Sequence, residues 1–281
     1  MNEYNPITKE FVKYNIESKK VSFAVPKSTK KIGKYAFSKA INLEEIILPE
    51  GLEEIDSYAF ADCENLKKII LPNTLKVIGP YAFNFCNSLE EIVIPENVKR
   101  LFCAAFTNCI SLKNVVLPKN LKTLDANVFA WCRSLNRINL DNIEDIGSGC
   151  FKDCESLQPK FSENLKAIGS RAFYNCLSIE ELDFPKSIKS IYESAFEGCK
   201  NLKKVNFPYK LDILGTLGNF TFTRCPHLLE VALPENICYS ERAFDEHIKF
   251  GPHNVDTIIE SAKSFKEMND TILEIDEAEE R

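Results

Sequence analysis

The stretch LKKIILPNTLKVIGPYAFNFC, residues 66–86, recurs in modified form along most of the chain. Its most constant part is a Phe, usually preceded by Ala and followed three residues later by Cys. This pair returns about every twenty-three residues, as Phe60-Cys63, Phe83-Cys86, Phe106-Cys109, Phe129-Cys132, Phe151-Cys154, Phe173-Cys176, Phe196-Cys199 and Phe222-Cys225. Sequences with one fixed period of this length form solenoids, whose stacked units bury a continuous core. The repeat predicts a scaffold with a long regular surface and no inherent catalytic cleft.

Each unit contains two extended segments. In the quoted copy, Leu66, Ile69 and Leu71 mark a main strand, because side chains of a strand alternate between its faces with period two. Pro72 ends that strand, since proline cannot donate a hydrogen bond to a neighbouring strand. Leu75 and Ile78 return to the same core from a second extended piece. The Ala-Phe segment then turns the chain, and we expect it to form a short helical turn.

These motifs resemble the BspA-like leucine-rich repeat family, whose units read Leu-x-x-Leu-x-Leu-Pro-x-x-Leu-x-x-Ile-Gly-x-x-Ala-Phe-x-x-Cys. The resemblance runs from about Val21 to Phe250, and the Gly of the family motif is kept in Ile32-Gly33, Ile78-Gly79, Ile146-Gly147 and Ile168-Gly169. It implies a right-handed coil with a parallel β-sheet on the concave face, and short second strands and helical turns on the other side. It also implies protein or surface recognition, because many members look like cell-surface antigens or adhesins.

Open solenoids need covered ends, since terminal units otherwise expose their core. We expect residues 1–20 to form an N-terminal cap, residues 21–250 a solenoid of about ten units, and residues 251–281 a C-terminal helix with an acidic tail. The N-terminal candidates for covering the core are Ile7, Phe11, Tyr14 and Ile16. The C-terminal helix is indicated by the spacing of Val255, Ile258, Ile259, Ala262 and Phe265. This helix either closes the core or docks on another protein.

Composition excludes several partner classes. The net charge of −6 gives no clustered basic surface for nucleic acid. Residues 1–20 carry charges throughout and offer no apolar stretch for a secretory signal, and no apolar run in the chain is long enough to span a membrane. The sequence therefore predicts a cytoplasmic protein, with display at the cell surface by a non-classical route as the alternative.

The eleven Cys residues raise the question of disulfides or a metal site. The eight on the repeat are expected in one row spaced by roughly 5 Å, the separation of neighbouring strands. A zinc site needs four ligands that converge on one point, and an undistorted disulfide needs a shorter Cβ separation of about 3.8 Å. Free, buried thiols are therefore expected, as is a buried Cys150, whereas Cys103 and Cys238 fall at variable positions that suit exposed thiols.

Catalytic groups are sparse. The three histidines, His227, His247 and His253, all lie near the C-terminal end, and Cys225 and His227 have no third group to orient a base. The segment Gly215-Thr216-Leu217-Gly218-Asn219 lacks the Lys of a phosphate-binding loop. We interpret it instead as an insertion of three residues between Leu214 and Phe222 that protrudes locally. We predict no enzymatic activity, no cofactor and no metal.

The outward face of the main strands carries the candidate binding residues. Its central position reads Ile47, Ile70, Val93 and Val116 in successive units and then turns polar, from Asn139 to Asp183 and Asn206. A contiguous exposed apolar surface marks partner sites, although β-branched residues are also good strand formers. A second row, Tyr35, Tyr58 and Tyr81, recurs two residues before the Phe of the same N-terminal units, so the predicted partner-binding residues concentrate in the N-terminal half.

Two further patterns concern the stack itself. The polar pair that opens each main strand alternates in sign, as Glu44-Glu45, Lys67-Lys68 and Glu90-Glu91, which predicts ion pairs that fix the register of the coils. In the sixth unit, Gln158-Pro159-Lys160-Phe161 has one residue fewer than the other copies and places a proline within the strand. We expect a bend or bulge there, between the units with apolar faces and those with polar faces.

Two functions remain open from the sequence. The first is an intracellular module that holds a protein partner on its apolar strand face without chemistry of its own. The second is a surface-displayed or released adhesin-like protein that recognises host or matrix ligands, glycans included.

Overall fold

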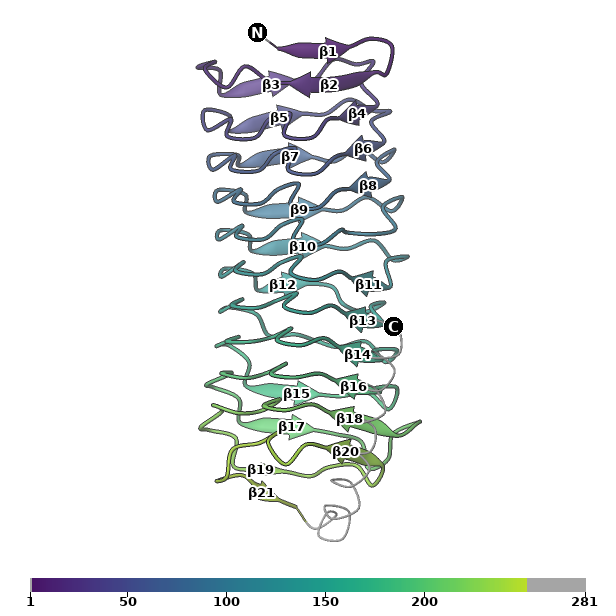
Figure 1. Cartoon of the computed structure of the whole chain (residues 1–281), viewed down its shortest axis with the longest axis vertical. Helices are drawn as coiled ribbons and strands as arrows, with labels where there is room; N and C mark the ends of the chain where they lie inside the picture. The colour runs from purple at the N-terminus through teal and green to yellow at the C-terminus, as the bar shows by residue number, and fades with distance from the viewer. Residues whose placement is uncertain (1, 252–281) are drawn as a thin grey trace, which may run out of the picture.

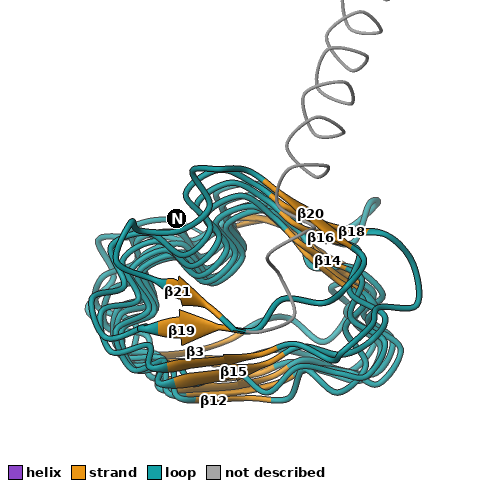
Figure 2. Cartoon of the chain, turned by 90° about the horizontal axis from the view of Figure 1, so that it is seen from below, coloured by secondary structure: helices purple, strands orange, loops and turns teal. Residues whose placement is uncertain are grey.

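The computed structural model describes residues 2–251, which form a column of stacked coils (Figure 1). Most coils contribute one main strand and one second strand, and the two sets of strands lie on different sides of the column, with the core between them (Figure 2). The coils in Figure 1 are stacked almost straight. We therefore use the term main-strand face for the surface that was predicted to be concave.

The main strands stack in parallel register, as the spacing of Leu66, Ile69 and Leu71 predicted. Ile46 lies opposite Ile69, and Ile92 lies opposite Val115. The ten main strands within the described residues are β3 (Ser22–Ala24), β5 (Glu45–Ile47), β7 (Lys68–Ile70), β9 (Glu91–Val93), β10 (Asn114–Val116), β12 (Arg137–Ile138), β15 (Glu181–Asp183), β17 (Lys204–Asn206), β19 (Glu230–Val231) and β21 (Lys249–Phe250).

The second strands are also parallel to one another. They are β2 (Glu10–Lys13), β4 (Lys31–Ile32), β6 (Glu54–Ile55), β8 (Val77–Ile78), β11 (Thr123–Leu124), β13 (Asp145–Ile146), β14 (Ala167–Ile168), β16 (Ser190–Ile191), β18 (Gly215–Leu217) and β20 (Ile237–Tyr239). One further strand, β1 (Glu3–Asn5), runs antiparallel to β2 and covers the first edge of this ladder. Exposed strand edges attract other chains, so β1 protects the N-terminal end of the column.

The chain returns from each second strand to the next main strand through a segment of turns, here called the turn column. It contains no helix within residues 2–251, so the helical turns predicted from the sequence are not found. The residues two before and two after each repeat Phe from Phe37 to Phe222 adopt a left-handed backbone, as Tyr58 (φ 56°) and Asp62 (φ 59°) do around Phe60. Left-handed residues interrupt a right-handed helix, which explains why none forms.

Hydrogen bonds in the turn column alternate between two kinds of partner. The N–H groups of Tyr58, Phe60 and Asp62 donate to the carbonyl oxygens of the next coil, while those of Ala59, Ala61 and Cys63 donate within their own coil. A helix would keep all of these bonds inside one coil. The alternation instead ties every coil to the following one through its backbone.

The core holds two rows that run the length of the column. The rings of Phe11, Phe37, Phe60, Phe83, Phe106, Phe129, Phe151, Phe173, Phe196, Phe222 and Phe244 stack with neighbouring centroids 4.8–5.7 Å apart. Beside them, the eight repeat cysteines are free and buried. Each thiol donates a hydrogen bond to the carbonyl oxygen of the Phe one coil earlier, for example from Cys109 Sγ to Phe83 O at 3.1 Å. The cysteines therefore do more than fill volume.

The sixth unit breaks the main-strand ladder, where a bend or bulge was expected. No main strand forms between β12 and β15, although the second strands continue through β13, β14 and β16. The side-chain amide of Gln158 takes over part of the missing pairing, because it accepts from Glu180 N at 3.0 Å and donates to Glu181 O at 2.7 Å. Phe161 reaches the core and stacks on Phe184 with ring centroids 5.6 Å apart.

Three other expectations need correction. Residues Gly215–Leu217 form the second strand β18 and do not protrude; the extra residues precede them, where Ile213 and Leu214 are exposed. Cys238 is buried within β20, so it is not an exposed thiol. Phe11 and Tyr14 are buried at the N-terminal end, but Ile7 and Ile16 are exposed and cover nothing there.

The predicted C-terminal helix, with Val255, Ile258, Ile259, Ala262 and Phe265, lies outside the described residues. The proposed division at residues 20 and 250 stays a prediction.

Candidate functional site

The main-strand face carries a row of exposed aliphatic side chains, here called the apolar ribbon: Ile47, Ile70, Val93 and Val116. Their exposed fractions are 53%, 70%, 62% and 49%. Ile47 pairs in register with Ile70, and Val93 with Val116, because each unit places the same position at the same height of its strand. The alternate positions, such as Ile46 and Ile69, point inward and are buried. The strand period thus turns one sequence position into a continuous outward surface.

Ion pairs run beside the apolar ribbon. Lys67 Nζ lies 2.9 Å from Glu44 Oε2, Lys68 Nζ 2.8 Å from Glu45 Oε1, and Lys113 Nζ 2.9 Å from Glu90 Oε2. The predicted pairing between neighbouring units is therefore present. Because each of these charges has an opposite charge beside it, the ribbon is flanked by a locally neutral border.

The apolar ribbon ends at Asn139. Its side-chain amide exchanges two hydrogen bonds with the backbone of Leu117, at 2.7 and 3.0 Å, and so continues the strand pairing with a side chain. Beyond the break in the ladder, the same position holds Asp183 and Asn206, which hydrogen-bond to each other at 2.6 Å. The face thus has an apolar N-terminal part and a polar C-terminal part.

The predicted tyrosines lie elsewhere. Tyr35, Tyr58 and Tyr81 stack on one another with centroids 4.9 and 4.8 Å apart, and each has a left-handed backbone in the turn column. Burial and the two neighbouring tyrosines raise the pKa of Tyr58. The turn column and the main strands are different parts of the coil, so the structure does not bring the tyrosines and the apolar ribbon into one site.

Besides a hollow of about 490 Å³ beside Tyr35 and Tyr58, three hollows accompany these rows, and the sequence did not predict them. The first, of about 180 Å³, lies on the apolar ribbon between β5 and β7 and is lined by Ile47, Ile70 and Pro72, among others. The second, of about 570 Å³, lies at the break in the sixth unit, between Pro159, Phe161 and Pro185. The irregular Gln158-Pro159 sequence was the available signal for the second hollow, since it removes a strand.

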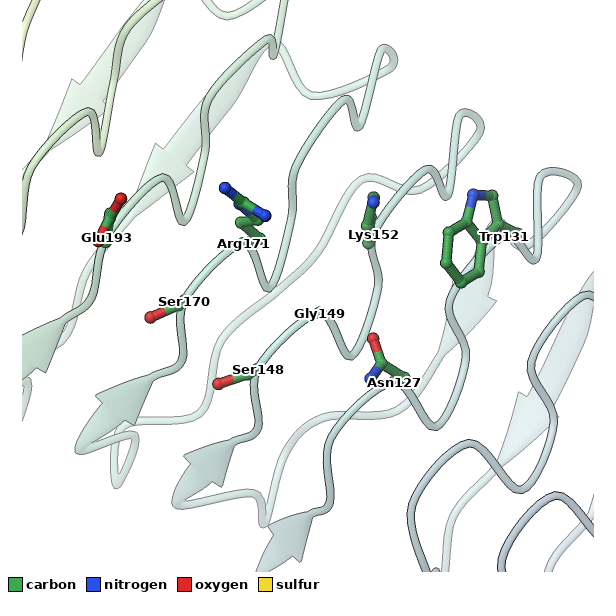
Figure 3. A pocket seen from close by; sticks show the side chains of 8 residues that line it. All are labelled: Asn127, Trp131, Ser148, Gly149, Lys152, Ser170, Arg171 and Glu193. Atoms are coloured by element: carbon green, nitrogen blue, oxygen red, sulfur yellow. The ribbon is translucent and has the colours of Figure 1, made fainter.

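The third hollow, of about 340 Å³, lies on the turn column. Figure 3 shows Gly149 at its centre, with Trp131, Lys152 and Arg171 on one side and Ser148 and Ser170 on the other. No sequence motif marked this place, because its residues come from four successive coils.

The thiols and histidines offer little chemistry. Burial raises the pKa of the Cys63 and Cys225 thiols to about 12, so both are neutral at pH 7. His227 and His247 are exposed, and His253 lies outside the described residues. Within residues 2–251, no three His, Cys, Asp or Glu side chains are grouped so that they could hold a metal ion. The same residues include no helix with the length and apolarity that crossing a bilayer requires.

Comparison with known proteins identifies the repeat. The family described as BspA type leucine rich repeat region matches residues 9–136 and 123–251 with six copies. No curated protein matches the chain.

Solved structures of leucine-rich repeat proteins are similar over most of their length. One from Bacteroides ovatus is 25% identical, with 82% of this chain and 83% of that chain covered and a TM-score of 0.37. The leucine-rich repeat protein of T. pallidum is 24% identical, with 81% and 87% covered and a TM-score of 0.44. The pneumococcal vaccine antigen PcpA is 20% identical, with 82% and 67% covered and a TM-score of 0.47.

Proposed function

This chain belongs to the BspA type leucine-rich repeat family, and we propose that it is a non-catalytic scaffold that binds a protein partner through its main-strand face. Proteins of this repeat family are in general binding scaffolds without catalysis. The observation that carries the proposal is the apolar ribbon: four aliphatic side chains in adjacent coils, each about half exposed or more. Isolated exposed aliphatic residues are ordinary, whereas a contiguous row marks an interaction surface.

The geometry suits an extended apolar contact. The ribbon advances by one strand separation, roughly 4.8 Å, per coil, so a partner segment lying along the column can meet one side chain after another. Covering the exposed half of one such side chain contributes on the order of 1 kcal/mol. The paired charges beside the ribbon favour a partner without strong net charge, because most of the charges on that face are already balanced by a neighbour.

The test compares two variants on the same face. Ile70→Asp combined with Val93→Asp places two charges in the ribbon, whereas Ala232→Asp places a charge at the matching exposed position of the C-terminal part. We expect affinity capture to recover the same partner with the wild type and Ala232→Asp, and to lose it with the double variant. Equal recovery with all three proteins, each shown to be folded by thermal unfolding, would place the site elsewhere.

A second proposal follows from the family alone. The protein is then a surface-displayed or released adhesin-like protein whose ligand is host or matrix material. Cell fractionation separates the two: recovery of the native protein in the cytoplasm supports the first, and recovery at the surface or in the medium supports the second.

A further inference from the structure

The hollow of about 340 Å³ on the turn column owes its shape to one glycine. The position two residues before the Phe holds Tyr58 and Tyr81 in the early coils but Gly149 in the coil of Phe151. Gly149 has a φ of +61°, and a Cβ atom added there would clash with Asn127 Oδ1. The row of side chains is therefore interrupted between Asn127 and Arg171, and the interruption opens the hollow.

The lining of this hollow is rich in polar groups without partners. Lys152 and Arg171 form no ion pair with any of residues 2–251, in contrast to Lys166, whose Nζ lies 2.6 Å from Glu144 Oε2. The side chains of Ser148, Ser170 and Asn127 and the indole N–H of Trp131 likewise make no hydrogen bond within that part of the chain.

The aromatic groups hold one of these cations in place. Lys152 Nζ lies 4.9 Å from the ring centroid of Trp131 and 5.6 Å from that of Tyr174. Cation–π contacts of this kind restrain the ammonium group without neutralising its charge. Lys152 therefore presents a full positive charge at the rim of the hollow, across Gly149 from the serines (Figure 3).

One acidic group decides the class of ligand. Glu193 also lines the hollow and has no ion-pair partner among the described residues. A simple oxyanion would be attracted by Lys152 and Arg171 but repelled by Glu193. A ligand that carries both an acid group and hydroxyl groups satisfies all three, because its hydroxyls donate to the carboxylate and exchange hydrogen bonds with the serines and Asn127.

We propose that this hollow is a binding site for an acidic monosaccharide, with the acid group between Lys152 and Arg171 and the sugar hydroxyls toward Ser148, Ser170 and Glu193. Its volume lies within the range of roughly 300–1,000 Å³ that small-molecule sites occupy. The site goes beyond the proposed protein-binding function and is independent of it, because it lies on the turn column and shares no residue with the apolar ribbon.

Titration calorimetry of the full chain in low salt tests the proposal with three probes: D-glucuronic acid, D-glucose and acetate. We expect D-glucuronic acid to bind at least about tenfold more tightly than D-glucose or acetate. D-Glucose lacks the acid group, and acetate lacks the sugar hydroxyls. If acetate binds as tightly as D-glucuronic acid, the hollow recognises only the acid group. If D-glucose binds as tightly, the hollow recognises only the sugar hydroxyls. Either result, or no binding of glucuronic acid, would overturn the proposal.

Variants test the residues. Arg171→Gln and Lys152→Gln each remove one charged hydrogen bond and should weaken glucuronic acid binding by about tenfold to a hundredfold. Gly149→Asn keeps a residue that tolerates a left-handed backbone and should abolish binding by filling the hollow. Lys200→Gln, an exposed lysine elsewhere on the turn column, is the charge-matched control and should bind normally. The Ile70→Asp, Val93→Asp variant should also bind normally, which separates a failure here from a failure of the protein-binding proposal.

Discussion

Alkaline pH should unfold this protein through its buried thiols. Burial raises the pKa of nine of the eleven thiols, and for Cys63 and Cys225 the raised value is about 12. The other seven are Cys86, Cys132, Cys150, Cys154, Cys176, Cys199 and Cys238. In the unfolded chain a thiol has a pKa of about 8.5. Above that pH the unfolded chain releases protons that the folded protein retains, so the free energy of unfolding must fall as the pH rises.

The size of the effect follows from the difference in thiol ionisation between the folded and the unfolded protein. At pH 9.5 the unfolded chain gains about 1.4 kcal/mol from ionising one thiol, while a thiol with a folded pKa near 12 gains almost nothing in the folded state. The effects of the buried thiols add, so their combined effect is on the order of the whole free energy of unfolding of a typical domain, about 5–15 kcal/mol. We therefore expect cooperative unfolding between about pH 9 and 10.

Urea unfolding under reducing conditions, followed by circular dichroism at pH 7, 8.5 and 9.5, measures this dependence. The matched variants are Cys176→Ala, in the buried row, and Cys103→Ser, which changes a thiol that is only partly buried. Cys176→Ala should lower stability at pH 7 by about 1–2 kcal/mol, because it removes the hydrogen bond to Phe151 O and leaves a gap. It should also reduce the loss of stability between pH 7 and 9.5 by about 1.4 kcal/mol. If Cys176→Ala and Cys103→Ser show the same pH dependence as the wild type, the thiols do not govern alkaline unfolding.

Two other predictions concern the stack. Gln158→Ala should lower the free energy of unfolding by about 1 kcal/mol, because it leaves Glu180 N–H and Glu181 C=O without the amide that bridges the broken ladder. Unchanged urea unfolding would show that water replaces the amide without loss. Glu44→Lys combined with Glu45→Lys places like charges beside Lys67 and Lys68 and should lower stability in low salt by up to about 1 kcal/mol, with the difference vanishing in 1 M salt; a loss of the same size at both salt concentrations would contradict the electrostatic explanation.

The period of the sequence was enough to predict the stack. The spacing of Ile69 and Leu71 placed the main strand, and the Phe and Cys positions predicted two inward rows, because a solenoid repeats the same environment at each period. The exposure of Ile70 and Val93 followed from strand alternation. The role of the apolar ribbon as a binding site stays a prediction.

Helical turns were expected in the turn column and are not found, although the sequence carries a signal for a left-handed backbone there. The positions two before and two after the Phe often hold residues that tolerate a left-handed backbone, such as Asp62, Asn108, Asn127, Gly149 and Gly198. Tyr58 and Tyr81 occupy the same positions and obscured the pattern, because tyrosine rarely adopts that backbone. The hollow at Gly149 could not be predicted from the sequence, because it depends on how side chains from neighbouring coils are arranged.

Around each repeat Phe from Phe37 to Phe222, the backbone bonds between coils point one way: N–H groups of one coil donate to carbonyl groups of the following coil. Each coil in this column therefore offers the same two joining surfaces as its neighbours, donors on one side and acceptors on the other. A coil duplicated or deleted between two others leaves these backbone bonds unchanged, although the alternating charged pairs on the main strands are preserved only when two coils are added or removed together. Length is thus the property that evolution can alter most freely in such a protein, in steps of roughly 5 Å of reach per coil.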